Sequence, residues 1–251
     1  MRRYYADRSE YLGDPDFFKV PVARLLEPSY IKERRDSIDP NKVTPSDQIR
    51  AGKYPAKEST ETTHFNIVDA EGNAVAMTYT LNGGYGNGVT VPGLGFLLNN
   101  EMDDFAAKPG VPNMFGLIQG ESNAIAPGKR PLSSMTPTIV LKDGKLYLVV
   151  GAPGGSRIIT AVMQVILNVI DFGMNVQDAV DAPRIHHQWM PDQLYFEKTI
   201  SPDTLALLKS RGHQLDPSKP QVLARVEAIL SLDGWLMGGT DSRAPGKSAG
   251  Y

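Results

Sequence analysis

The chain changes character abruptly at Thr62. Residues 1–61 are polar, rich in Asp, Arg, Lys and Pro, and hold one short apolar helix candidate at residues 20–26. Their last part, residues 39–61, shows no sustained hydrophobic period, so we expect an extended, solvent-exposed connector there. From Thr62 onwards, strand-like runs alternate with turn residues. The sequence therefore predicts two regions, 1–61 and 62–251, joined where a protease or a self-cleaving reaction could reach the chain.

The region after Thr62 predicts hairpins followed by helices. Strands are expected in two pairs, at residues 64–68 with 74–81 and at residues 138–141 with 146–150. Ser156 is expected to cap a helix whose apolar residues, from Ile158 to Ile170, cover more than one face, which implies burial under a sheet. Further helices are expected at residues 176–180 and 202–210, and further strands at residues 194–197 and 222–230. This order is typical of a layered α+β domain with antiparallel sheets.

The composition excludes several classes of protein. The 251 residues are 41% hydrophobic, enough for one sizeable core. With 22% charged residues and a net charge of −2, there is no electrostatic reason to expect nucleic acid or an anionic membrane as partner. The absence of cysteine excludes disulfides, thiol catalysis and cysteine–zinc sites. The N-terminus is not typical of a secretory signal, and no stretch is apolar for long enough to cross a membrane.

Thr62 is a candidate nucleophile. A threonine hydroxyl needs a base beside it, and a cut between Glu61 and Thr62 would free an α-amine, with an ordinary pKa of roughly 7.7–8.0, within the same residue. Alternatively, Thr62 and Thr63 simply open a β-strand, where threonine is common. The change in composition at this point keeps both interpretations open.

Three further segments combine residues that could carry chemistry. Residues 153–157 (PGGSR) could offer backbone N–H groups to an oxyanion or an anion, or could be a tight strand-to-helix turn. Residues 99–104 (NNEMDD) could bind an ammonium group or a hard cation, or form a solvated loop. Residues 129–135 (KRPLSSM) offer two hydroxyls in what could be an ordinary turn. His186-His187 lack the spacing of a metal site, so we expect them to pack structurally.

Four segments, in this order, resemble the γ-glutamyltransferase family, whose members are also called glutathione hydrolases. They are residues 62–82 (TTHFNIVDAEGNAVAMTYTLN), 97–113 (LLNNEMDDFAAKPGVPN), 129–140 (KRPLSSMTPTIV) and 151–160 (GAPGGSRIIT). The similarity continues through residues 182–189 (APRIHHQW) to the terminal SAGY, and residues 6–17 (ADRSEYLGDPDF) resemble the end of the family's large subunit.

The resemblance implies a fold and a mode of maturation. It implies an N-terminal-nucleophile hydrolase, an αββα sandwich of stacked antiparallel sheets flanked by helices, incomplete here on its N-terminal side. Family precursors cleave themselves into a large and a small subunit. Residues 1–61 would then be the end of the large subunit with its connector, and residues 62–251 the small-subunit catalytic domain. Bacterial relatives are typically exported, which implies a periplasmic or extracellular location.

The resemblance also implies the reaction. Thr62, freed by cleavage after Glu61, would attack the γ-glutamyl amide of glutathione or a similar compound, and the acyl group would pass to water or to an amino acid or peptide. Thr80 matches a second threonine that hydrogen-bonds the nucleophile's amine, and Gly154 and Gly155 match the amides of the oxyanion hole. The family requires no metal or organic cofactor.

The expected substrate-binding residues fall into two groups. By resemblance, Asn82, Glu101 and Asp104 hold the substrate's α-amino end, and Ser133 and Ser134 help to hold its α-carboxylate. An ammonium group favours carboxylate partners in a water-poor pocket, which agrees with these roles.

The chain departs from the family pattern in three ways. Most of the large subunit, which supplies an arginine for the substrate carboxylate, is absent. Phe115 stands where some members place a lid tyrosine, so a hydroxyl contact to the Asn82 position is lost and gating is expected to be looser. Glu61 precedes the scissile bond, which we expect to matter little because Thr62 supplies the attacking hydroxyl. Two alternatives therefore stay open: a related acylase with a non-glutamyl substrate, and an inactive fragment that needs the missing large-subunit region.

Overall fold

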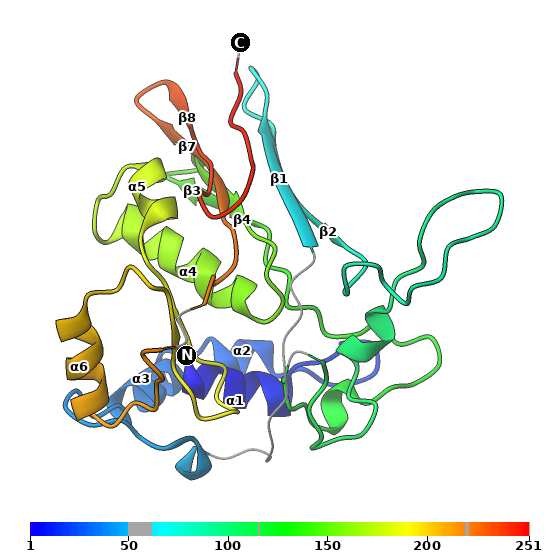
Figure 1. Ribbon diagram of the computed structural model, residues 1–251, viewed down its shortest axis with the longest axis vertical. Coiled ribbons are helices and arrows are strands. Elements are labelled where there is room, and N and C mark those ends of the chain that lie inside the picture. The colour runs from blue at the N-terminus through cyan, green and yellow to red at the C-terminus, as the bar shows by residue number, and fades with distance from the viewer. Residues whose placement is uncertain (50–61, 115, 219–220, 251) are drawn as a thin grey trace.

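The computed structural model describes residues 1–49, 62–114, 116–218 and 221–250. Three helices of the N-terminal segment lie together at one end of the molecule (Figure 1): α1 (Arg2–Tyr11), α2 (Val22–Leu25) and α3 (Pro28–Asp36). The other α-helices are α4 (Arg157–Ile170), α5 (Val176–Asp181) and α6 (Pro202–Ser210). Short 3₁₀ turns lie at η1 (Ser46–Gln48), η2 (Glu101–Asp104) and η3 (Glu121–Asn123).

The strands form antiparallel sheets. A hairpin pairs β1 (Thr62–Val68) with β2 (Ala74–Thr80). A four-stranded sheet has the order β3-β4-β7-β8, with strands β3 (Thr138–Lys142), β4 (Lys145–Gly151), β7 (Glu227–Leu232) and β8 (Trp235–Gly239). A small ladder joins β5 (Ile185–His186) to β6 (Tyr195–Phe196). The expected α+β class with antiparallel sheets is confirmed.

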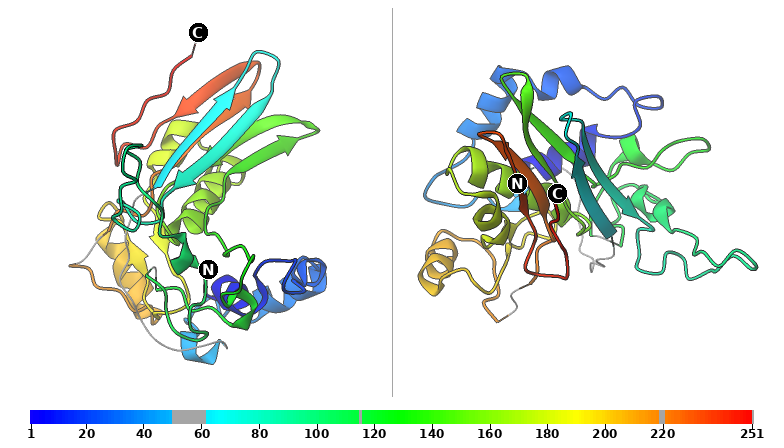
Figure 2. Two further views of the ribbon diagram at one scale, coloured as in Figure 1. Left: turned by 90° about the vertical axis from the view of Figure 1, so that its right-hand side faces the viewer. Right: turned by 90° about the horizontal axis from the view of Figure 1, so that it is seen from above.

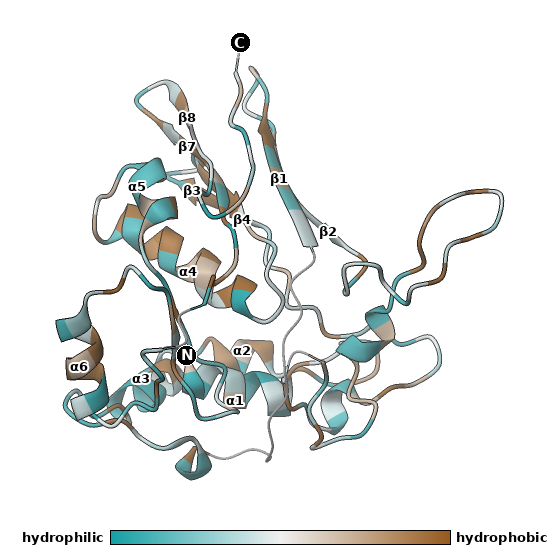
Figure 3. Ribbon diagram, in the orientation of Figure 1, coloured by the Kyte–Doolittle hydropathy of each residue, from teal (hydrophilic) through white to brown (hydrophobic). Residues whose placement is uncertain are grey.

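Helix, sheet and hairpin follow one another as layers (Figure 2). The apolar face of α4 packs on the four-stranded sheet, with Ile158, Val165 and Val169 buried in one cluster with Leu148 and Val150. Apolar residues run along α4 and along the strands beneath it (Figure 3). The expectation that the helix is buried under a sheet is therefore confirmed, and burial of this kind contributes roughly 1.5–3 kcal/mol for each large aliphatic side chain.

The hairpin lies on the other face of that sheet and presents its polar side inward. The His64 ring contacts Gly151, and the Asn66 side chain donates to the Glu227 carbonyl at 2.8 Å. Because side chains alternate along a strand, the apolar residues of the hairpin point outward. Five of them are between 41% and 59% exposed: Phe65, Ile67, Val75, Met77 and Tyr79. Of the four layers expected, the described residues supply three, and the outer face of the hairpin is bare.

The N-terminal segment is more structured than its composition predicts. One short helix was expected there, and three form. The first, α1, is held by contacts with residues far along the chain, and its Tyr5 and Arg8 side chains are buried. The expected exposed connector is confirmed at residues 39–42, 47 and 48, which are exposed, but not at Ser46 and Ile49. Trp189 donates its indole N–H to the carbonyls of Ser46 and Ile49, at 3.0 and 2.8 Å, and both residues are buried. Residues 50–61 lie outside the described part of the chain.

Two local predictions also need correction. The Ser156 side chain does not cap α4, because its hydroxyl donates to the Gln188 side chain at 2.8 Å. The strand expected at residues 222–230 begins only at Glu227. The preceding chain cannot be extended there, because Ala224 has a φ of +65°.

A buried ion network ties the last strand to the helical layer. Arg184 and Asp241, both almost fully buried, pair at 3.0 Å. Asp241 also accepts from the Val226 backbone N–H at 2.7 Å and pairs with Arg243 at 3.0 Å, and Arg243 in turn pairs with Glu197. A buried charge is tolerable only when its partners are present.

Replacing Asp241 by alanine should therefore strongly destabilise the chain. Loss of one member of a buried pair leaves the other charge uncompensated, and we expect the free energy of unfolding in urea to fall by about 3–5 kcal/mol. Asp36, which pairs with Lys32 on the surface, is the matched control, and Asp36→Ala should cost less than about 1 kcal/mol. Equal losses in the two variants would contradict a stabilising role for the network.

Candidate active site

Thr62 and Thr80 face each other across the hairpin. They are register partners at the open end of β1 and β2, and the Thr62 hydroxyl donates to the Thr80 hydroxyl at 3.1 Å. The Thr80 oxygen also accepts from the Asn82 backbone N–H at 2.8 Å. Thr62 has no free α-amine in the uncut chain, and Thr80 contacts its hydroxyl. The expected contact between Thr80 and the amine of Thr62 stays a prediction for the cut chain.

His64 supports the start of β1 from behind. Its ring nitrogens lie 2.9 Å from the Thr78 hydroxyl and 2.9 Å from the Asn66 side-chain oxygen. A Cβ at Gly151 would collide with the ring, so only glycine allows β1 to come this close to β4. Burial lowers the pKa of His64, which favours the neutral ring.

Asn82 begins the turn after β2 in a left-handed conformation. Its φ is +71°, which asparagine tolerates better than most residues, and its side chain donates to the Asn100 carbonyl at 3.2 Å. The Asn100 side chain in turn accepts from the Gly83 backbone N–H at 2.7 Å. These two amides join the end of β2 to η2, which carries the acidic residues.

Glu101 and Asp104 share a hydrogen bond on η2. Burial, and then the nearby Glu101 charge, raise the pKa of Asp104 to about 7, and burial raises the pKa of Glu101 as well. Two carboxylates this close cannot both ionise at low cost, so the pair holds a proton that a cation would displace. Asp103 points elsewhere and accepts from the Met114 backbone N–H at 2.8 Å.

The two serines lie on the segment that precedes β3. Ser133 accepts from the Met135 backbone N–H at 3.0 Å, and Ser134 accepts from the Arg8 guanidinium at 3.1 Å. Asn123, fully buried, joins this segment to the acidic turn. It accepts from the Leu132 N–H at 3.0 Å and donates to the Asp104 carbonyl at 2.7 Å.

The glycine loop joins β4 to α4. Gly154 has a φ of +144° and Gly155 a φ of +58°, conformations that glycine adopts without strain. The loop is held from both sides at Ser156: the Tyr5 hydroxyl donates to its carbonyl at 2.5 Å, and its own hydroxyl donates to Gln188 at 2.8 Å. A loop fixed in this way can present backbone N–H groups at the start of α4 to a developing negative charge.

One small cavity, of about 20 Å³, brings most of these residues together. Seven of the residues proposed from the sequence line it: Thr62, Thr80, Asn82, Asp104, Ser133, Ser134 and Gly155, together with Met135 and Ile158. Glu101 and Gly154 do not line the cavity, but Glu101 hydrogen-bonds to Asp104 and Gly154 directly precedes Gly155. Glu61 and Phe115 lie outside the described residues.

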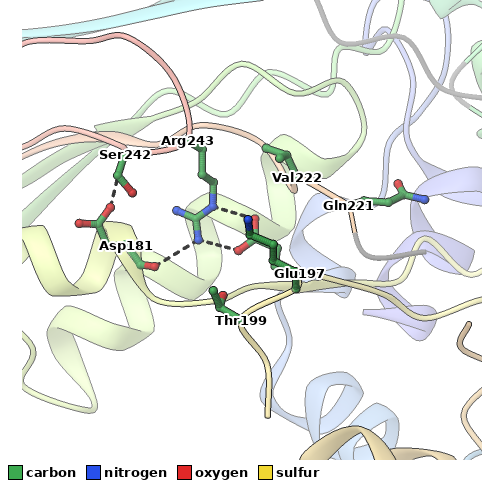
Figure 4. A pocket seen from close by; sticks show the side chains of 8 residues that line it. Asp181, Glu197, Thr199, Gln221, Val222, Ser242 and Arg243 are labelled. Carbon is green, nitrogen blue, oxygen red and sulfur yellow. Dashed lines mark hydrogen bonds and ion pairs between the residues drawn. The ribbon is translucent and has the colours of Figure 1, made fainter. Parts of the chain in front are cut away.

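A larger hollow of about 450 Å³ lies elsewhere, between α5, β6 and the C-terminal segment. Arg243, one of the cationic residues that line it, is hydrogen-bonded to neighbouring groups of the chain (Figure 4). Arg243 donates to Glu197 and to the backbone carbonyls of Val180, Asp181 and Ala182. With its guanidinium bonds used in this way, Arg243 serves the fold rather than a ligand.

The adjacent histidines pack structurally, as expected. His186 and His187 are both buried, and burial lowers the pKa of His186 to about 3, so the ring is neutral. His186 contacts Thr160 at 2.7 Å and Gln188 at 3.0 Å, behind the glycine loop. Among the described residues, no group of three or more His, Asp or Glu side chains is arranged to hold a metal ion.

The sequence did not indicate Arg8, Asn123, Met135 or Ile158 as parts of the site. Both Arg8 and Asn123 hydrogen-bond to the segment that carries the serines. Arg8 lies more than 120 residues before its partner Ser134, and Asn123 lies about ten residues before its partner Leu132. No local pattern around either residue marks such a contact.

Gly154→Ala should distort the glycine loop. A Cβ at this position would lie 2.6 Å from the Ala224 Cβ, and the φ of +144° is strained for alanine. We expect the free energy of unfolding to fall by more than about 2 kcal/mol. Gly95→Ala is the control, because Gly95 also has a positive φ but no atom lies within 4 Å of the position that a methyl group would take there. A loss no larger than that of the control would show that the Ala224 contact is unimportant.

The whole chain, residues 1–251, matches the family model described as gamma-glutamyltranspeptidase. A relative from Escherichia coli (strain K12), named glutathione hydrolase proenzyme, is 55% identical over 249 residues. These residues make up 98% of this chain and 43% of the relative. The chain thus spans less than half the length of curated relatives that it matches.

Solved structures agree in fold. Gamma-glutamyltranspeptidase from Pseudomonas nitroreducens, complexed with L-DON, aligns with a TM-score of 0.72 at 46% identity, over 75% of this chain and 99% of that one. Cephalosporin acylase from Bacillus halodurans aligns with a TM-score of 0.82 at 29% identity, over 100% of this chain and 43% of that one. The expected fold class is confirmed. A family match over every residue, with 55% identity to a relative, shows that the chain belongs to the γ-glutamyltranspeptidase family.

Proposed function

We propose that this chain carries the catalytic centre of a γ-glutamyltransferase and glutathione hydrolase, with Thr62 as its N-terminal nucleophile. The observation that carries the proposal is the shared cavity. The Thr62 hydroxyl, an acidic side chain, two serines and a loop glycine line one space. These are the groups needed to attack an amide, bind an amino acid head and stabilise an oxyanion.

Maturation begins with a cut between Glu61 and Thr62. The Thr62 hydroxyl attacks the Glu61 carbonyl carbon and forms an ester as the peptide C–N bond breaks. Water then hydrolyses the ester, leaving a carboxylate on Glu61 and a free α-amine on Thr62. The Pseudomonas nitroreducens chain supports this cut, because it corresponds to 75% of this one. Residues 62–251 number 251 − 61 = 190, about 76% of the chain.

In turnover, the freed α-amine of Thr62 takes the hydroxyl proton while the oxygen attacks the γ-carbonyl carbon of the donor. The N–H groups of Gly154 and Gly155 stabilise the oxyanion. The amine then passes the proton to the leaving nitrogen, which gives an acyl ester on Thr62. Water or an amino acid amine attacks that ester, and the products are glutamate or a new γ-glutamyl amide, with the Thr62 hydroxyl restored.

The charge at the pocket favours a γ-glutamyl donor over a plain acyl group. The Glu101–Asp104 pair provides negative charge for an α-ammonium group, and Ser133 and Ser134 provide hydroxyl donors for an α-carboxylate. A plain acyl group would leave both ends unpaired. The acylase alternative is therefore the weaker of the two.

A large-subunit segment is the proposed partner. The bare apolar face of the hairpin, with Phe65, Ile67 and Tyr79, is of a kind that a further layer covers in a sandwich. The relatives are more than twice as long as this chain, which leaves ample protein to form that layer. Residues 1–49 would stay bound after the cut, through Arg2–Asp192 at 2.8 Å and Arg130–Asp14 at 2.5 Å.

The described residues form no helix that is both long and apolar enough to cross a membrane. A periplasmic or extracellular location is proposed only by resemblance to exported family members.

Thr62→Ala tests the nucleophile. The wild-type chain of 27.4 kDa should yield two fragments separated before Thr62 when measured by mass spectrometry. It should also hydrolyse γ-glutamyl-p-nitroanilide when a large-subunit segment is co-expressed. Thr62→Ala should remain uncut and inactive, because it lacks the attacking oxygen, whereas Thr62→Ser should cut more slowly. Cleavage in Thr62→Ala, or an uncut and silent wild type even with the added segment, would refute the proposal.

Glu101→Gln tests the acidic pair. Because the pKa of Asp104 is raised to about 7, the KM for a γ-glutamyl donor should rise as the pH falls below about 7. The slope should be up to about tenfold per pH unit, since one proton competes with the ammonium group. Removing the Glu101 charge should lower the pKa of Asp104, so that the rise begins at lower pH. The pH profile of kcat, governed by the Thr62 amine, is the control and should not move. If the pH profile of KM in Glu101→Gln matched that of the wild type, the Glu101–Asp104 pair would have no role in substrate binding.

A further inference from the structure

Arg8 is a buried cation behind the serine end of the pocket. It lies on α1 and is 3% exposed. Its Nη2 donates to the carbonyls of Leu132 and Ser133, at 3.4 and 3.3 Å, and to the Ser134 hydroxyl oxygen at 3.1 Å. Within the described residues, no carboxylate pairs with it. Since burying a charge is costly, its position requires an explanation.

Arg8 determines which way the Ser134 hydroxyl can point. A serine oxygen that accepts a hydrogen bond keeps its own hydrogen available for donation. Ser134 accepts from Arg8, and Ser133 accepts from the Met135 backbone N–H. Both serines line the cavity that contains Thr62. Both hydroxyls are therefore set to donate to an anionic group in that cavity.

Arg8 also acts on the acidic end of the same cavity. Asn123 ties the Leu132 N–H to the Asp104 carbonyl, so the segment that Arg8 holds is joined directly to the acidic turn. Burial and the charges of Glu101 and Asp103 raise the pKa of Asp104, and the Arg8 charge opposes them. These are the charged groups that act on Asp104 from the elements around it.

We propose that Arg8 is a positioning residue of the substrate pocket: it orients the Ser134 hydroxyl toward the donor's α-carboxylate and places a fixed positive charge behind the serine end of the site. The proposal rests on the γ-glutamyl function proposed above. Arg8 precedes the proposed cut and Ser134 follows it, so the pocket of the mature protein is built from both pieces of this chain.

The kinetic test compares Arg8→Gln with the wild type, each full chain co-expressed with the large-subunit segment. KM for γ-glutamyl-p-nitroanilide should rise about tenfold, while kcat stays within about twofold, because the nucleophile is untouched. Arg35→Gln is the matched control. Arg35 lies on α3 of the same N-terminal segment, but its side chain is 73% exposed and lies 3.6 Å from the exposed Asp36. Its KM should stay within about twofold of the wild type.

The second test follows the Asp104 carboxyl by ¹³C NMR across pH and needs no turnover. The pKa of Asp104 should rise in Arg8→Gln, stay at the wild-type value in Arg8→Lys, which keeps the charge, and stay unchanged in Arg35→Gln. A global loss of packing would not separate the lysine variant from the glutamine variant in this way.

The outcomes are distinguishable. An unchanged Asp104 titration in Arg8→Gln overturns the inference whether or not the protein turns over substrate. An inactive wild type with a shifted Asp104 in Arg8→Gln refutes the proposed function alone. If Arg8→Gln does not fold, Arg8→Lys decides: it should raise KM several-fold while keeping the wild-type titration, and a wild-type KM would overturn the role in orienting Ser134.

Discussion

The geometry of the site depends on the close approach of the His64 ring to Gly151. Any side chain at Gly151 would collide with the ring, so this glycine sets how closely β1 lies on β4. Thr62 precedes His64 by two residues on the same face of its strand, and Gly155 follows Gly151 by four residues. The same contact therefore controls the distance between the Thr62 hydroxyl and the amides of the glycine loop. His64 and Asn66 point toward the sheet and make the inner face of the hairpin polar, so by alternation its apolar side chains lie on the outer face.

The N-terminal segment works as a scaffold although it is mostly polar. Tyr5 packs in a small cluster with Trp189 and holds the Ser156 carbonyl, and Arg2 pairs with Asp192. Charge-assisted and buried hydrogen bonds of this kind fix the N-terminal segment to the rest of the protein, whereas burial of apolar side chains fixes α4 to the sheet. Because the partners lie on the other side of the proposed cut, the segment has what it needs to stay associated once the covalent link is broken.

The sequence was sufficient where a feature follows from local pattern. The β1–β2 hairpin and helices α4 and α6 agree with their predicted ranges to within about two residues, because alternation and apolar periodicity are local properties. The motifs also identified seven of the nine residues that line the cavity. The helices α1 and α3 were missed because their sequences are polar, and the hydrogen-bond partners of the buried Tyr5 and Arg8 lie more than 120 residues away. The side chain of Ser156 failed as a cap for the same reason: Gln188, distant in sequence, takes its hydroxyl.

The arrangement of charge, more than the nucleophile, distinguishes the two proposed chemistries. A threonine hydroxyl beside loop amides would serve any acyl donor. The acidic pair at one end of the cavity and the serine segment with Arg8 behind it at the other form a dipole that matches a zwitterionic amino acid head. The cavity has an accessible volume of about 20 Å³ and opens to solvent. A donor that satisfies both charged ends would recover the cost of desolvating them through charge-assisted bonds, whereas an uncharged acyl group would leave these polar groups unpaired. Under the proposed function, selectivity for the γ-glutamyl group follows from this cost of leaving charged groups without a partner.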